Sequence, residues 1–167
     1  MTAFAALGDT LGRLADAIRP LDDEEFTARD FAASGSIGAH VRHCLDHAWA
    51  LERGIATRVV CYDHRERSTV VENDRALAVS RLRRAQTRLG GISDSLLDRP
   101  LTLVSQIHED GRTVRVGTTA GRELAFVISH TVHHSALVAV LLEHAHHSVP
   151  HRFGLAPTTP AETVCAR

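Results

Sequence analysis

The sequence has 167 residues, a length typical of one domain with its own hydrophobic core. Its formal net charge is −1, from 19 basic and 20 acidic residues, so we expect neither nucleic acid nor a membrane as a partner. The first 20 residues mix charged with apolar side chains, which is atypical of a signal peptide, and we expect a cytoplasmic protein. The 3 cysteines lack the spacing of a metal cluster, and the lack of lysine suggests a bacterial source with a GC-rich genome.

Hydrophobic periodicity predicts four helices. In chain order they run from Phe4 to Ile18, from Ile37 to about Thr57, from roughly Glu72 to Leu89, and from about Gly121 to about His144. Ser36 is a typical N-cap for the second helix, and the glycines at 90 and 91 are typical of a helix end.

The segment before the last helix has a different pattern. Short apolar runs flank Asp110-Gly111, a dipeptide that favours a β-hairpin turn. The tail from about residue 149 is rich in proline and threonine, and we expect it to be irregular. Because amphipathic helices must bury their apolar stripes, we predict that residues 1–167 form one all-α domain, a four-helix bundle with a short β-hairpin before the last helix. That helix is apolar nearly all round, which favours a central position or a dimer interface.

The last predicted helix sets histidines among apolar residues, in the run ISHTVHHSALVAVLL. On a helical wheel His130 and His134 lie within about 40° of each other and face the predicted core. Since they are one turn apart, both rings can reach one metal ion. His133 points to another side of the helix.

The second predicted helix also carries histidines beside its apolar stripe. His40, His43 and His47 lie within about 60° of one another on the wheel. Two facing rows of imidazoles predict a three-nitrogen site with open positions, which is typical of catalytic zinc-type centres. The alternative is a set of core histidines satisfied by hydroxyl or carbonyl groups, with no ion.

Four segments of the sequence resemble the DinB-like, YfiT-like metal-binding proteins of bacteria. They are SIGAHVRHCLDH in the second helix, YDHRERSTVVENDR after it, and GRELAFVISHTVHHSALVAVLL with FGLAPTTP near the end. The resemblance implies an up-down-down-up bundle, often a homodimer, with three histidines holding nickel, zinc or an iron-like ion. By position these ligands are His43, His130 and His134. The wheel places His40 and His47 nearer the apolar stripe than His43, and His47 is the reserve ligand.

The resemblance leaves the reaction open, because some relatives use low-molecular-weight thiols and many have no known activity. We expect a metal-dependent enzyme of the thiol S-transferase or hydrolase type. A divalent ion would activate a thiol or water toward a small-molecule substrate. Zinc and nickel are the first candidates for this ion, and iron and manganese are the alternatives. A low-molecular-weight thiol is the candidate co-substrate.

Glu123 is the candidate catalytic acid or base, because it lies within about 20° of His130 on the wheel. An acid in the first turn of a helix also interacts favourably with the helix dipole, which is the structural alternative for Glu123. The alternative function is a non-catalytic stress or accessory protein with a structural or regulatory ion.

Overall fold

The structure is a computed structural model that describes residues 2–30, 35–63 and 69–160. The described chain is mainly helical, as predicted, with two small sheets. Its helices are α1 (Ala3–Ile18), α2 (Asp23–Thr27), α3 (Ile37–Thr57), α4 (Thr69–Asn73), α5 (Arg75–Gly90) and α6 (Ala120–His144), with a 3-10 turn at Asp94–Leu96. Its strands are β1 (Arg29–Asp30), β2 (Gly35–Ser36), β3 (Val59–Val60), β4 (Pro100–Gln106) and β5 (Thr113–Thr119).

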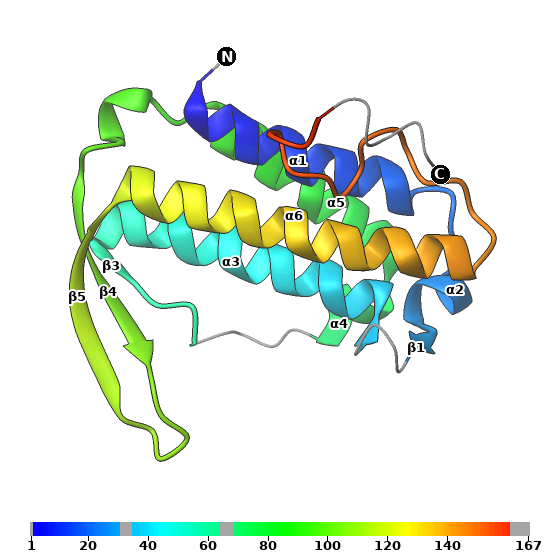
Figure 1. Ribbon diagram of the computed structural model, residues 1–167, viewed down its shortest axis with the longest axis horizontal. Helices are drawn as coiled ribbons and strands as arrows, with labels where there is room; N and C mark the ends of the chain where they lie inside the picture. The colour runs from blue at the N-terminus through cyan, green and yellow to red at the C-terminus, as the bar shows by residue number, and fades with distance from the viewer. Residues whose placement is uncertain (1, 31–34, 64–68, 161–167) are drawn as a thin grey trace.

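The four long helices lie along one another and carry the core (Figure 1). Helix α1 packs on α5 and α6, and α3 packs on the same two helices. Each fully buried aliphatic side chain contributes roughly 1.5–3 kcal/mol to this packing. The buried leucines include Leu7, Leu11, Leu14, Leu45, Leu51, Leu82, Leu89 and Leu142. This core holds α3 beside α6, the two helices that contain the predicted metal ligands.

Local sequence signals set the ends of α3. The Ser36 hydroxyl accepts a hydrogen bond from the backbone N–H of Ala39 at 3.1 Å, as the predicted N-cap should. The helix ends at Thr57, and Arg58 caps it in the left-handed conformation with φ of 63°. The predicted range of this helix is confirmed.

The third predicted helix is wrong at its start. The pattern predicts one helix from about Glu72, but α4 ends at Asn73 and a new helix, α5, begins at Arg75, after one intervening residue. Asp74 causes the break, because its carboxylate accepts a hydrogen bond from the backbone N–H of Leu77 at 2.8 Å and caps α5. The predicted end is close to the observed one, since α5 extends to Gly90.

A three-stranded sheet lies at one end of the long helices (Figure 1). Strands β4 and β5 pair antiparallel on either side of Asp110-Gly111, where Gly111 has a φ of 87°. Strand β3 pairs parallel with β4, with Val60 opposite Leu103. Only Arg58 lies between the end of α3 and this two-residue strand, and Tyr62 comes two residues after Val60.

The described residues after α6, 145–160, contain no helix or strand. Phe153 of this segment is 5% exposed and belongs to the core. Gly154, with a φ of 74°, lies so close to the backbone of Ala136 that a Cβ would collide with it. The segment therefore packs against α6.

Within the described chain, one helix, α6, is long and apolar enough to cross a membrane by length and composition alone. Its most apolar 18-residue window has a mean hydropathy of 1.6, and 39% of that window is buried. A core helix passes the same test, so this single helix is weak evidence for a membrane span.

Candidate metal centre

Five histidines meet where α3 packs against α6. Helix α3 contributes His40, His43 and His47, and α6 contributes His130 and His134. The ring centroids lie 4.1 Å apart for His47 and His130 and 4.5 Å apart for His43 and His134. The two rows of imidazoles that the helical wheel predicts therefore face each other.

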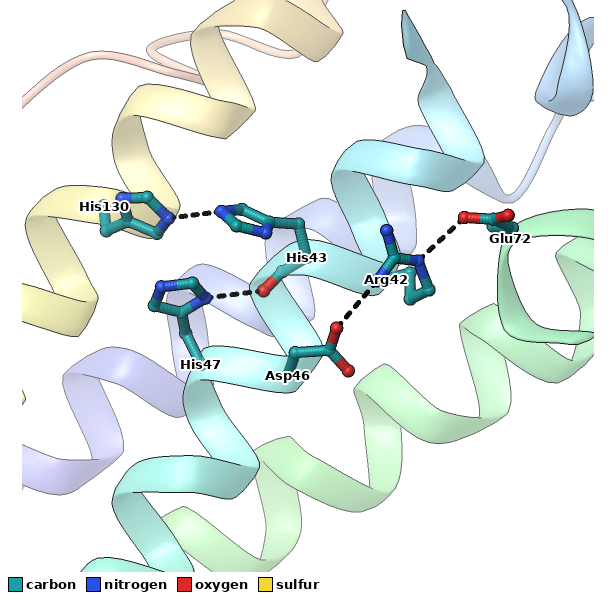
Figure 2. Close-up of polar contacts among 6 residues, drawn as sticks. All are labelled: Arg42, His43, Asp46, His47, Glu72 and His130. Atoms are coloured by element: carbon teal, nitrogen blue, oxygen red, sulfur yellow. Dashed lines mark hydrogen bonds and ion pairs between the residues drawn. The ribbon is translucent and has the colours of Figure 1, made fainter. Parts of the chain in front are cut away.

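The centre of this cluster is the pair His43 and His130, whose rings point toward one another (Figure 2). Their Nε2 atoms lie 2.8 Å apart. Between two neutral imidazoles, such a contact requires one nitrogen to donate a proton and the other to accept it. The same two nitrogens are also placed to share one metal ion.

His47 joins this pair from the next turn of α3. Its Nδ1 atom lies 3.0 Å from the backbone oxygen of His43, also drawn in Figure 2. Because a carbonyl only accepts, Nδ1 carries the proton, and the lone pair of the neutral ring is on Nε2. Metal-binding histidines commonly show this arrangement, which fixes the tautomer and the ring orientation. The side chains of His43, His47 and His130 each offer one nitrogen, and these atoms all lie within 4.8 Å of one another.

His134 adjoins the same pair, with ring centroids 4.5 Å from His43 and 4.6 Å from His130. Its Nδ1 atom also lies 3.0 Å from Nδ1 of the buried His40. Burial, followed by the nearby His130 and His40, lowers the pKa of His134 to about 3. The ring is therefore neutral near pH 7, the form that binds metals. The ligand set His43, His130 and His134 stays a prediction, and His133 is exposed.

The three-histidine group fits a divalent first-row ion. Two nitrogens bound to one ion at about 2.0–2.1 Å lie at most about 4.2 Å apart. The group within 4.8 Å therefore needs only small side-chain shifts to converge on one ion. An all-imidazole donor set suits zinc or nickel better than magnesium or calcium, which prefer oxygen ligands.

Glu123 lies at the start of α6 and is completely buried. Its carboxylate accepts three hydrogen bonds, from the Tyr62 hydroxyl at 2.9 Å, the Thr118 hydroxyl at 2.7 Å and the Arg122 guanidinium at 2.9 Å. The catalytic role of Glu123 stays a prediction. Its hydrogen bonds link it to the histidines indirectly, through Tyr62.

Tyr62 is the residue of the site that the sequence analysis missed. Its ring stacks on His47 with centroids 5.1 Å apart and planes 9° apart. Burial raises the pKa of Tyr62, and the charge of Glu123 raises it further, so the hydroxyl remains a proton donor. A single tyrosine in a polar connection gives no local signal of such a contact.

A separate polar network ties α4 to α3. The Arg42 guanidinium contacts Asp46 at 2.9 Å and Glu72 at 2.7 Å (Figure 2). All three side chains are at most about one-quarter exposed, so these ion pairs are better shielded from solvent than ordinary surface pairs. This network joins α4 to α3.

A pocket of about 380 Å³ lies near the C-terminal end of α6, between that helix and α2. It is lined by Asp22, Glu24, Glu25, Ala28, Arg29, Asp30, Ile37, Leu141, His144 and Ala145. None of the five clustered histidines is among these described lining residues, so we do not assign the pocket to the metal centre.

Comparison with known proteins identifies the family of this chain. Residues 4–156 match the DinB family. A stretch of 102 residues is 36% identical to FK506-binding protein 5 of Rhizopus delemar. The aligned stretch covers 60% of this chain and 26% of that protein. The chain thus matches only about a quarter of that relative's length. No solved structure matches the chain. Since the family match covers nearly the whole chain, from the first helix to beyond α6, the protein belongs to the DinB family.

Proposed function

We propose that the protein is a metal-dependent enzyme of the thiol S-transferase or hydrolase type, with a divalent ion held by His43, His47 and His130. The observation that carries the proposal is the convergence of three imidazole nitrogens within 4.8 Å. A zinc or nickel ion held by three neutral imidazoles keeps its double charge and acidifies a thiol or water at an open position.

The third ligand distinguishes two versions of the site. His43 and His130 belong to both versions. The hydrogen bond from His47 to a backbone oxygen at 3.0 Å supports His47, whereas the family resemblance implies His134. Competition with a chromophoric chelator measures the zinc affinity of His47→Ala and His134→Ala side by side. We expect His47→Ala to lose more than about 100-fold and His134→Ala about 10-fold or less; the reverse order would make His134 the ligand.

The residues of the chain supply binding and orientation. The contact of α3 with α6 brings His43 and His130 together, so their rings are held by two rigid helices rather than by loops. The backbone oxygen of His43 orients His47. His47 is only 5% exposed, so this side of the site excludes water. Such a site favours a small thiol or another small substrate that can reach the partly exposed rings.

The burial of His47 also supports the second function, a structural or regulatory ion without catalysis. The two functions differ in activity. A panel of low-molecular-weight thiols is tested with monochlorobimane, a model electrophile, using the zinc-loaded protein and the double variant His43→Ala/His130→Ala. Conjugation that disappears in the double variant supports the enzyme. A stoichiometric ion without any conjugation or hydrolysis supports the structural or regulatory function.

We further propose that α1, α3, α5 and α6 form the up-down-down-up bundle of the family, and that the protein is a homodimer in the cytoplasm. The pairwise packing of these helices supports the bundle. Helix α6 supports a covered face in a dimer, because its most apolar 18-residue window is only 39% buried. Light scattering coupled to size exclusion measures the mass, and a monomer at micromolar concentration would contradict the dimer.

A further inference from the structure

Two aromatic rings lie against imidazoles of the metal centre. One contacts a histidine of α3, and the other contacts a histidine of α6. Tyr62 stacks on His47 at 5.1 Å, and Phe126 stacks on His130 at 5.6 Å with planes 22° apart. The two aromatic rings also contact each other, with centroids 5.1 Å apart. We call Tyr62 and Phe126 the aromatic brace. The brace stacks on one imidazole from α3 and on one from α6.

The brace is anchored on one buried carboxylate. Glu123, which is 0% exposed, accepts the hydrogen bond from the Tyr62 hydroxyl at 2.9 Å. Arg122 contacts the same carboxylate at 2.9 Å, and its guanidinium carbon lies 5.6 Å from the centre of the Phe126 ring. Glu123 is therefore linked to Tyr62 directly and to Phe126 through Arg122.

This anchor is rigid for a physical reason. A carboxylate removed from water is costly unless its oxygens accept hydrogen bonds, and Glu123 accepts three. Moving Tyr62 would break one of these bonds inside the protein. The stacked ring of Tyr62 then restricts rotation of the His47 imidazole, whose Nδ1 is already held by the His43 backbone oxygen. An imidazole restricted in this way loses little freedom when it binds an ion.

We propose that Tyr62 and Glu123 are positioning residues of the metal centre, which orient His47 through the aromatic brace. The inference rests on the proposed function with His47 as a ligand. It assigns Glu123 an indirect role, because its described contacts reach the imidazoles through Tyr62 and not by a hydrogen bond of its own. The affinity of the site should consequently depend on the Tyr62 hydroxyl, through its hydrogen bond to Glu123.

The test uses Co²⁺ as the probe, because it reports both affinity and ligand geometry through its visible absorption. Tyr62→Phe removes only the hydroxyl, and Tyr62→Leu removes the stacked ring. We expect Tyr62→Phe to weaken Co²⁺ binding about 10-fold and Tyr62→Leu toward about 100-fold, each with a changed absorption spectrum. The variant Glu123→Gln should resemble Tyr62→Phe. The double variant Tyr62→Phe/Glu123→Gln should lose no more than the weaker-binding single variant, because both changes act on the same contact.

Glu72→Gln is the matched control. It also weakens a polar link between two elements, the contact with Arg42, but it does not touch the brace. We expect it to keep the wild-type affinity and spectrum, while circular dichroism shows that all variants are folded. Wild-type affinity and spectrum in both Tyr62 variants would overturn the inference and leave the proposed function intact. An equal loss in Glu72→Gln would also overturn it, and a wild-type protein without stoichiometric Co²⁺ would refute both.

Discussion

The Nε2 atoms of His43 and His130 lie 2.8 Å apart, although 87 positions separate the two residues in the chain. The packing of α3 on α6 produces this contact. In the metal-free protein, two neutral rings can share only one proton here, whereas an ion would use the lone pairs of both nitrogens. Binding of an ion at this contact would therefore be coupled to the stability of the helix pair.

Zinc should stabilise the folded protein. A ligand that binds only the folded state adds about 2.7 kcal/mol to the free energy of unfolding at 100 times its dissociation constant. We expect urea unfolding to shift in this way for the wild type and not to shift for the double variant His43→Ala/His130→Ala. His108→Ala is the control, since this exposed side chain lies on the β4–β5 turn. A similar zinc effect in the double variant would argue against this site.

Loss of the buried carboxylate should destabilise the protein even without metal. Glu123→Ala removes the carboxylate that accepts from the part-buried hydroxyls of Tyr62 and Thr118, and the loss of such an acceptor costs up to about 1–3 kcal/mol for each group. The matched variant is Glu143→Ala, at an exposed position of the same helix, which should change stability by less than about 0.5 kcal/mol. Urea unfolding with EDTA present measures both. Equal stability of the two variants would show that the Glu123 network contributes little.

Gly38 lets α4 and α2 approach α3 closely. A Cβ at this position would collide with the backbone oxygen of Glu72 and lie 2.9 Å from the Phe26 ring. Gly38→Ala should therefore cost on the order of 1–3 kcal/mol, since these elements must move apart. Gly90→Ala is the matched control, because nothing lies within 4 Å of its Cβ, and the change should be neutral or stabilising by up to about 1 kcal/mol. Thermal unfolding compares the two, and a neutral Gly38→Ala would contradict the close approach.

The thiol of Cys44 should be unreactive in the folded protein. Burial, with a smaller contribution from the charge of Asp46, raises the pKa of its thiol to about 12. Below that pH the side chain stays a thiol, and the thiolate is the reactive form. In the variant Cys61→Ser/Cys165→Ser, we expect the disulfide reagent DTNB to label Cys44 at pH 8 only as fast as the protein unfolds. Complete labelling within minutes under native conditions would contradict this burial.

Much of the fold follows from local sequence. The periodicity of apolar residues and the N-cap Ser36 predict α3, and the same periodicity predicts α6, because helical hydrogen bonds and caps are local. The facing rows of histidines follow from the helical wheel, since the angle between residues on one helix is fixed. The prediction that failed is the start of the third helix. Asp74 caps a new helix there, and the pattern of apolar residues does not distinguish a continuous helix from two helices separated by a cap.

The remaining parts of the site depend on contacts between distant segments. Strand β3 has only two residues and gains its partner from β4, more than 40 positions later, so no alternation in the sequence indicates it. Tyr62 reaches Glu123 across 61 positions for the same reason. The choice between His47 and His134 depends on ring orientations, which neither the wheel nor the motif spacing determines.

The metal content of tag-free protein tests the central claim most directly. After mild dialysis, mass spectrometry of the metals measures ions per chain in the wild type and in His43→Ala/His130→Ala. Because three imidazole nitrogens converge within 4.8 Å, we predict about one zinc or nickel ion per chain in the wild type and less than about 0.1 in the double variant. A folded wild type with no stoichiometric ion, or a double variant with the same metal content, would contradict the three-histidine centre.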